Sequence, residues 1–224
     1  MSQTNVTSCD FVPEIVAKMN ARGVAGVTYA EMDFLNMTYA DASFDVVIDK
    51  GSFDAICLDD DPESEQKYTK YLSEQIRVLD AATSGKFVVV SLLQAHVFDA
   101  LLDYFVRGKN NPGFEGFAFD LQLIKLDKIC DVQDSKFVSF MLVFTKRALA
   151  AGAARDTKLS LKTALGRDWE PLSEEELKHR IKVMQYEAVV VDDVKQFRRG
   201  QVFQQFTEKS VGGVPRYNLI VRDA

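Results

Sequence analysis

Two pairs of an acidic and an aromatic residue stand at the ends of apolar runs in this sequence. Asp10 and Phe11 follow the short β-type run 5–8, and Asp33 and Phe34 follow the run 24–32. A carboxylate at a strand tip can accept hydrogen bonds from two ribose hydroxyls or from an adenine amino group. An aromatic ring beside it offers a flat apolar surface to a base. The repeated pair therefore indicates a candidate site for a ligand with a sugar and a base.

A third polar group ends the apolar run 44–48, where Asp49, Lys50 and Gly51 follow one another. On its own this triplet also fits an ordinary polar turn, since glycine lets the chain change direction. A lone Asp10 or Asp33 likewise fits a turn or a helix cap. Together the three groups indicate a ligand site, because ligands of an open parallel sheet bind at the carboxyl ends of its strands.

The elements that would position these groups alternate along the first two thirds of the chain. Apolar runs bounded by turn residues predict strands, and segments of helical period separate them. The predicted strands are 24–32, 44–48 and 86–93, and the predicted helices are 13–21, 64–79 and 95–106. Near-continuous apolar strands alternating with helices predict an α/β fold with a parallel sheet that is covered on both faces.

The remaining third of the chain departs from this alternation. Runs 117–126 and 137–145 predict neighbouring antiparallel strands that close the sheet. Ser173 and Glu176 form a capping box, which predicts a helix to about residue 186. Two β runs, 201–206 and 217–221, predict a terminal hairpin. We therefore expect a main domain at 1–147, a linker at 148–172, and a helix with a hairpin at 173–224 that packs on the main domain.

Composition narrows the possible functions. The 224 residues are 47% hydrophobic and 27% charged with a net charge of −6, so the chain can bury a core and shows no nucleic-acid footprint. No apolar run is long enough to span a membrane. Three dispersed cysteines predict reduced thiols and a cytoplasmic location, and they do not form a metal-binding pattern. His96 fits a helix-start residue bonded to backbone better than a catalytic base. The pattern leaves the oligomeric state open.

Several segments together resemble a known family. The segments CDFVPEIVAKM, MDFLNMTYADASFDVVIDKGSFDAI and SGKFVVVSLLQAHV, and the terminal GGVPRYNLIVRDA, look like the seven-strand S-adenosylmethionine-dependent methyltransferases. Within that family they resemble the enzymes whose fourth strand ends in Asp/Glu-Lys-Gly-Thr-Leu-Asp-Ala. The resemblance runs from about residue 10 to 223 and is loose over 106–200. It implies a Rossmann-like sheet and S-adenosyl-L-methionine as the cofactor.

The resemblance also implies roles for the first strand tips. Asp10 would bind the cofactor ribose with Phe11 beside it, and Asp33 and Phe34 would hold the adenine edge.

At the third tip, Lys50 would reach the methionine carboxylate, and Gly51 would let the chain turn. Asp49 would orient Lys50 or face the acceptor lysine. No catalytic residue is identified.

The family's Gly-x-Gly loop has no counterpart in this sequence, because Gly23 and Gly26 lie between a helix and a strand. The chain begins about where the family's second strand ends, so we expect the first strand, which lies in the middle of the family's sheet, to be absent. Either Met1 is an internal start of a longer protein, or cofactor binding has been lost. In both cases we expect this chain to bind the cofactor weakly or not at all.

The implied activity is protein-lysine methylation, with translation elongation factor 1-alpha as the acceptor protein. Two alternatives stay open at this point. The chain could be a non-catalytic methyltransferase-like module that binds a protein partner, or a methyltransferase for a different protein.

Overall fold

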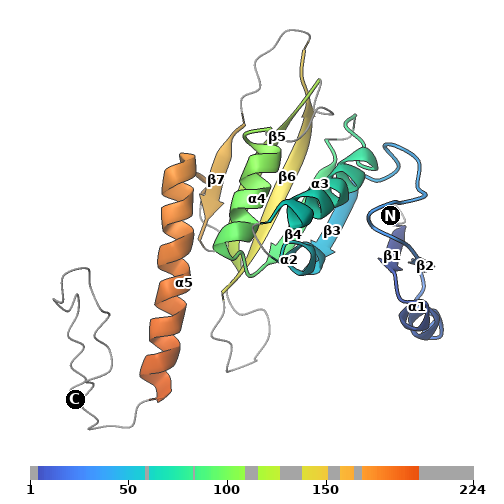
Figure 1. Ribbon diagram of the computed structural model, residues 1–224, viewed down its shortest axis with the longest axis horizontal. Helices are drawn as coiled ribbons and strands as arrows, with labels where there is room; N and C mark the ends of the chain where they lie inside the picture. The colour runs from blue at the N-terminus through green and yellow to red at the C-terminus, as the bar shows by residue number, and fades with distance from the viewer. Residues whose placement is uncertain are drawn as a thin grey trace, which may run out of the picture.

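The computed structural model of the chain describes residues 5–58, 61–82, 84–108, 116–126, 138–150, 157–163 and 168–196. Its described strands form two sheets, one of two strands and one of six, and helices lie between and beside them (Figure 1). The predicted α/β class is confirmed. The predicted terminal hairpin, 201–206 and 217–221, lies outside the described residues.

The smaller sheet belongs to a compact β-α-β unit. Strand β1 (Val6–Asp10) pairs in parallel with β2 (Val27–Glu31), and helix α1 (Pro13–Asn20) connects them. Proline at the first turn starts α1, as the sequence predicted. The strand β2 begins later than predicted, because Gly26 takes a left-handed conformation that turns the chain just before it.

The larger sheet is mixed, in the order β3-β4-β6-β5-β7-β8. Strands β3 and β4 are parallel, β6 is antiparallel to both β4 and β5, and β7 runs parallel to β5. The strands are β3 (Val46–Lys50), β4 (Lys86–Ser91), β5 (Phe117–Leu126), β6 (Ser139–Ala148), β7 (Leu159–Lys162) and β8 (Glu170–Pro171). The predicted antiparallel pair, β5 and β6, is confirmed.

Helices cover one face of the larger sheet. They are α2 (Ser52–Ile56), α3 (Pro62–Arg77), α4 (Ala95–Phe105) and α5 (Glu174–Gln196). Side chains that alternate along β4, β5 and β6 enter one core with α3, α4 and α5, and Phe105 stacks on Phe144 there at 4.0 Å between ring centroids. The opposite face stays half-buried at Val88 and Val143, and Ile48 in the same row is 70% exposed.

Some element boundaries differ from the sequence prediction. The predicted linker 148–172 contains β7 and β8, so its residues 159–162 and 170–171 belong to the sheet. Whether the chain divides into the predicted domains stays a prediction. Helix α5 extends past residue 186 to Gln196, and its predicted capping box is confirmed: Glu176 N–H approaches Ser173 Oγ at 3.3 Å, and the Glu176 carboxylate accepts from Ser173 N–H at 2.8 Å.

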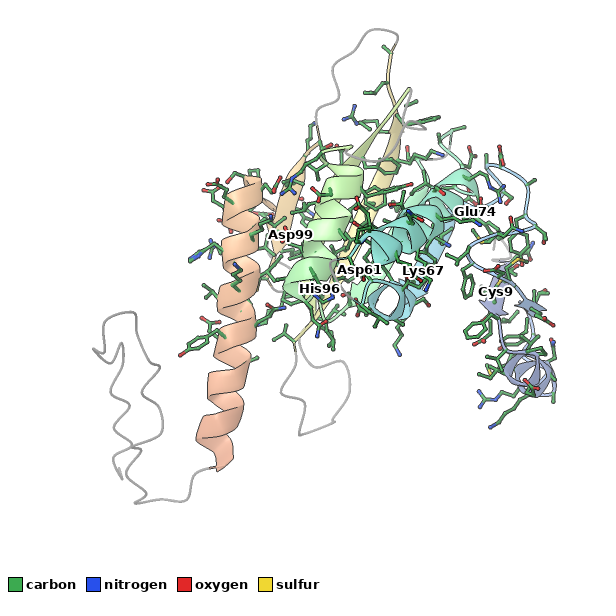
Figure 2. All side chains as sticks on the ribbon, in the orientation of Figure 1. Cys9, Asp61, Lys67, Glu74, His96 and Asp99 are labelled. Carbon is green, nitrogen blue, oxygen red and sulfur yellow. The ribbon has the colours of Figure 1, made fainter. Side chains whose placement is uncertain are left out.

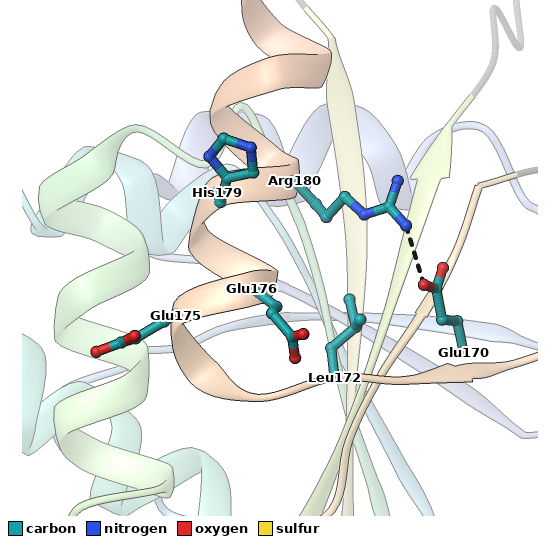
Figure 3. A pocket seen from close by; sticks show the side chains of 6 residues that line it. All are labelled: Glu170, Leu172, Glu175, Glu176, His179 and Arg180. Carbon is teal, nitrogen blue, oxygen red and sulfur yellow. Dashed lines mark hydrogen bonds and ion pairs between the residues drawn. The ribbon is translucent and has the colours of Figure 1, made fainter.

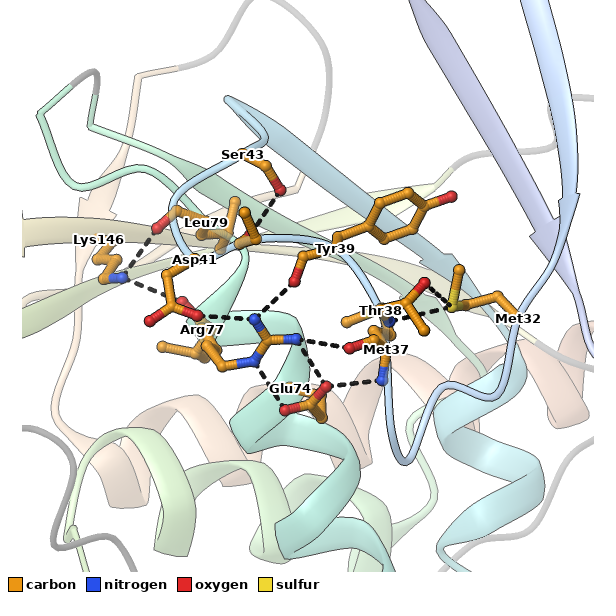
Figure 4. A network of polar contacts seen from close by, with 12 residues as sticks. Met32, Met37, Thr38, Tyr39, Asp41, Ser43, Glu74, Arg77, Leu79 and Lys146 are labelled. Atoms are coloured by element: carbon orange, nitrogen blue, oxygen red, sulfur yellow. Dashed lines mark hydrogen bonds and ion pairs between the residues drawn. The ribbon is translucent and has the colours of Figure 1, made fainter.

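No strand pair among the described residues joins the two sheets. Figure 1 draws β1 on the side of the small sheet nearer to β3, with both arrows pointing the same way. The connection runs through the segment between β2 and β3, which a charged network fixes onto α3 (Figure 4). The Arg77 guanidinium donates to the carbonyls of Met37 and Tyr39 and to Asp41, while Glu74 accepts from Arg77 and from Met37 N–H.

A buried lysine closes the end of the same helix. Lys146 on β6 is 7% exposed, and its ammonium donates to the carbonyls of Ile76 at 3.0 Å and Leu79 at 2.9 Å. Carbonyls at a helix end lack partners within the helix and carry partial negative charge, so a cation stabilises them. Burial lowers the pKa of Lys146, because desolvation disfavours its charged form.

Candidate functional site

The first two predicted tips lie side by side. Asp10 pairs in register with Glu31, and Met32 N–H continues the ladder by donating to the Asp10 carbonyl at 2.9 Å. The two acidic–aromatic pairs therefore leave the sheet at the same edge. Phe11 is 70% exposed there, which suits a surface for a ligand ring.

Each of the two tip aspartates also forms a local turn. Asp10 Oδ1 accepts from Val12 N–H at 2.9 Å, and Asp33 Oδ1 accepts from Leu35 N–H at 2.8 Å. Both aspartates therefore form the polar turns that the sequence allowed for each of them alone. Within the described part of the chain, no hydrogen bond occupies the second oxygen of either carboxylate, so each keeps an acceptor for a ligand.

A chain of contacts through Tyr71 of α3 links the second tip to the third. The Phe34 ring meets the Tyr71 ring edge-on at 6.4 Å between centroids, and the Tyr71 hydroxyl donates to Asp49 Oδ2 at 2.6 Å. The structure thereby brings the ends of β2 and β3 together even though their sheets do not pair. The sequence analysis did not predict this polar contact of Tyr71.

Asp49 turns into the protein. It is 4% exposed, and besides Tyr71 its carboxylate accepts from the amides of Ser52 at 2.8 Å and Phe53 at 2.9 Å. These two amides open helix α2, so Asp49 caps that helix. Burial raises the pKa of Asp49, against the hydrogen bonds from Tyr71 and from the two amides, which lower it. The geometry favours a positioning role, and direct cofactor contact by Asp49 stays a prediction.

The two residues that follow Asp49 are not buried. Lys50 is exposed, and Gly51 has a φ of 82°, a left-handed conformation that suits glycine. A Cβ built on Gly51 would meet nothing within 4 Å, so conformation and not crowding explains the glycine. The turn that Asp49 caps therefore leaves the lysine free to face the strand edge.

The end of β4 completes this edge. The Asp54 carboxylate of α2 accepts from Ser91 Oγ at 2.6 Å and from Leu92 N–H at 3.2 Å. His96 begins α4, and its Nε2 lies 2.9 Å from the Cys57 carbonyl, the backbone contact expected from the sequence. Beyond its place in the segment DKGSFDA, no feature of the sequence indicated a role for Asp54.

A thiol–phenol contact ties β1 to the connecting segment. Cys9 Sγ lies 3.3 Å from the Tyr39 hydroxyl, and burial with this contact raises the pKa of Tyr39 to about 12. Figure 2 shows Cys9 on the small sheet and His96 at the start of α4, on the two sides of the strand edge. Cys9 is half-buried, Cys57 is buried, and Cys130 lies outside the described residues.

A hollow at β8 and α5 lies away from this edge. A depression of about 310 Å³ opens between β8 and the first turns of α5, where Arg180 donates to Glu170 at 2.9 Å beside His179 (Figure 3). Its walls hold none of the predicted site residues. Across the described ranges, no group of histidine, cysteine and carboxylate side chains could hold a metal ion, and no helix has the length and apolarity to cross a membrane.

The predicted cofactor fits the described part of the edge in several respects. Available carboxylate oxygens at Asp10 and Asp33, an exposed ring at Phe11 and an exposed ammonium at Lys50 match a nucleoside with an amino-acid tail. The fit stops between β1 and β3, because no strand among the described residues pairs with the facing edge of either one.

Comparison with known proteins agrees with the resemblance read from the sequence. Residues 1–89 match the model of a methyltransferase domain family. The eEF1A lysine and N-terminal methyltransferase homolog of Drosophila melanogaster is 37% identical over 103 residues, which span 45% of this chain and 15% of that protein. The human eEF1A lysine and N-terminal methyltransferase is 32% identical over 103 residues, 46% of this chain and 14% of that protein.

A shorter relative matches as well. The human EEF1A lysine methyltransferase 2 is 31% identical over 94 residues, 39% of this chain and 38% of that protein. The chain thus spans well under half the length of these curated relatives.

Among solved structures, a SAM-dependent methyltransferase of Methanosarcina mazei is 12% identical with a TM-score of 0.43, covering 66% of this chain and 84% of that one. The N-methyltransferase NodS of Bradyrhizobium japonicum, solved with S-adenosyl-l-homocysteine, is 12% identical with a TM-score of 0.41, covering 63% and 66%.

Proposed function

We propose that the protein is an S-adenosylmethionine-dependent protein-lysine methyltransferase and that its acceptor is translation elongation factor 1-alpha. The proposal is supported by the match of residues 1–89 to the model of a methyltransferase domain and by curated relatives with 32–37% identity that bear the name of eEF1A methyltransferases. The observation that carries the proposal is the common edge of the strand tips at Asp10, Asp33 and Lys50. A translation factor as acceptor places the reaction in the cytoplasm.

In this proposal each strand tip contacts a different part of the cofactor. Asp10 accepts from the ribose hydroxyls, and the Phe11 ring flanks the nucleoside. Asp33 and Phe34 hold the adenine edge, and the Phe34 ring keeps its place by packing on Tyr71.

The Lys50 ammonium pairs with the methionine carboxylate as a point charge. Gly51 and the buried Asp49 set the turn that aims it.

The methyl transfer requires little covalent chemistry from the protein. When bound, the cofactor would supply a methyl group on a positively charged sulfur. The neutral lysine amine of the acceptor would attack the methyl carbon, so that an N–C bond forms as the C–S bond breaks and S-adenosylhomocysteine leaves. A free lysine has a pKa of about 10.4, so the site must favour the neutral amine through desolvation or a nearby acceptor. Alignment of the amine with the methyl group supplies much of the rate.

Methyl transfer tests the proposal directly. The protein is expressed with whatever coding sequence precedes Met1 in its gene, and it is incubated with radiolabelled S-adenosylmethionine and purified elongation factor 1-alpha. We expect label in the elongation factor and its loss with Lys50→Met. The same assay in cell lysate detects other acceptors, and a labelled band of a different protein would replace the proposed substrate.

A second candidate is a non-catalytic methyltransferase-like module that binds a protein partner. It is favoured by the lack of a Gly-x-Gly loop in the sequence and by the unpaired β1 and β3 edges among the described residues. We expect the 224-residue chain to bind S-adenosylmethionine weakly or not at all in a calorimetric titration. Micromolar affinity would refute that expectation, and an absence of label from every acceptor would favour the binding module.

A further inference from the structure

The turn between β4 and α4 holds a strained residue at the site edge. Leu93 has a φ of 54°, a left-handed conformation that is unfavourable for a residue with a branched, bulky side chain. Such a residue persists only where its surroundings fix it, and such residues cluster at functional sites. Leu93 is itself 1% exposed, so its side chain anchors the turn in the core.

Hydrogen bonds from two distant elements fix this turn. From one side, Asp54 of α2 accepts from Leu92 N–H and from Ser91 Oγ, and Ser91 Oγ in turn accepts from Leu93 N–H at 2.7 Å. From the other side, the Gln185 amide of α5 donates to the carbonyls of Leu92 at 3.1 Å and Leu93 at 2.9 Å. One side-chain amide therefore satisfies both carbonyls of the strained step.

A small cavity lies between α5 and the start of α4, next to this turn. A cavity of about 140 Å³ separates the start of α4 from α5, lined by Phe98 and Ile181 among others, and Gln185 closes it on the side of the turn. Lys178 pairs with Asp99 on the cavity wall. Gln185 therefore adds two hydrogen bonds to the apolar core that α5 shares with Leu93 of the turn.

The held turn displays Leu92 toward solvent at the edge. Leu92 is 39% exposed, and it lies two residues beyond Val90, the register partner of Lys50. The strained and doubly fixed turn thus presents an apolar side chain next to the strand that carries Lys50, at a position that a protein substrate can reach.

We propose that the β4–α4 turn is the acceptor-side wall of the site, that Leu92 contacts an apolar side chain next to the reactive lysine of the protein substrate, and that Gln185 is the positioning residue that sets this wall. The proposal rests on the proposed function for the identity of the acceptor. It makes α5, a helix far along the sequence from the strand tips, part of substrate selection.

Amide hydrogen exchange of the free chain tests the positioning role without any activity. Gln185→Glu keeps the shape of the side chain and places a carboxylate against two carbonyls, so exchange across 91–95 should quicken by at least about tenfold. Glu187→Gln, the reverse exchange at an exposed position of the same helix, should leave it unchanged. Unchanged exchange across 91–95 in Gln185→Glu would overturn the role of Gln185.

Binding of purified elongation factor 1-alpha tests the wall. The factor should slow exchange across 91–95, and Leu92→Ser should weaken its binding by about fivefold or more. Val183→Ser, at a residue of 38% exposure against 39% for Leu92, should change binding less than twofold. Protection that omits 91–95, equal effects of the two variants, or no binding at all would overturn the wall.

Methyl transfer separates this proposal from the function on which it rests. In an active protein, Leu92→Ser should raise the KM for the elongation factor while kcat changes little, since the wall acts in binding. Binding at 91–95 without any methyl transfer would support the wall and refute the enzyme.

Discussion

The β1–α1–β2 unit and the larger sheet differ in how they are stabilised. No residue from 5 to 31 is buried, and Phe11 and Ile15 stand 70% and 45% exposed. The larger sheet instead buries a continuous core in which several phenylalanine rings lie at 0–1% exposure. The unit that carries Asp10 and Phe11 therefore takes its stability from contacts outside itself. The candidate cofactor contacts at Asp10 and Phe11 and the buried core thus lie in different parts of the chain.

The largest expected effect concerns the core of the larger sheet. Phe105→Ala removes a ring at 1% exposure that stacks on Phe144, and it should cost about 3–5 kcal/mol of unfolding free energy. Ile15→Ala on α1 should cost less than about 1 kcal/mol, because that side chain is already exposed. Urea denaturation followed by circular dichroism measures both. Similar costs would mean that the small unit is buried more deeply than its exposure indicates.

The next effect concerns the connection between the two regions. Arg77→Met removes hydrogen bonds to two carbonyls and two carboxylates, and it should release the segment 33–45 at a cost of about 2 kcal/mol. Hydrogen exchange should quicken across 33–45 and stay unchanged across 87–89. Lys67→Met, on the same helix, removes only an exposed pair with Glu63 and serves as the control. Faster exchange in both regions would show that they unfold as one.

A smaller effect depends on pH. Burial raises the pKa of Asp49, so the folded protein holds that proton more tightly than the unfolded chain, and its stability contribution is lost as the pH rises above the ordinary value of 3.8. Tyr71→Phe deletes a donor that favours the carboxylate, which raises that pKa further. The substitution should cost about 1–2 kcal/mol at pH 7 and less toward pH 4.

Thermal melts of Tyr71→Phe across this pH range check the prediction. In an Asp49→Asn background the pH dependence of the Tyr71→Phe effect should vanish. If it persists there, another group is responsible.

The smallest effect compares two glycines. Gly51 and Gly23 both have positive φ, and a Cβ on either would meet nothing within 4 Å. Alanine at each should therefore cost about 1 kcal/mol through backbone strain alone. In a protein that binds S-adenosylmethionine, only Gly51→Ala should also lower the affinity, as measured by calorimetry. Equal loss of affinity would show that the β-α-β unit moves as a body with the site.

The sequence predicted most of the elements because their signals are local. Period and turn residues were enough for α1, β5 and the capping box of α5, each of which forms within its own segment. The strand tips were found for the same reason, since a polar residue directly after an apolar run marks its end.

The parts that the sequence did not predict depend on residues far apart in the chain. The contact of Tyr71 with Asp49 spans 22 positions, and that of Gln185 with Leu92 spans 93. Asp49 was expected near the ligand, and its inward turn follows from amides in a short helix, α2, that has no clear period. Likewise β7 joins the sheet by pairing with β5, and its four residues carry no local signal that predicts this pairing.

The unpaired edge of β3 has a consequence for how this chain behaves in solution. Among the described residues, β3 pairs only with β4, and its exposed side chains include Val46 and Ile48. An open strand with free backbone donors and acceptors and apolar neighbours is a template for any extended chain that it meets. We expect self-association through this edge to rise with protein concentration, and a strand that paired with β3 would suppress it.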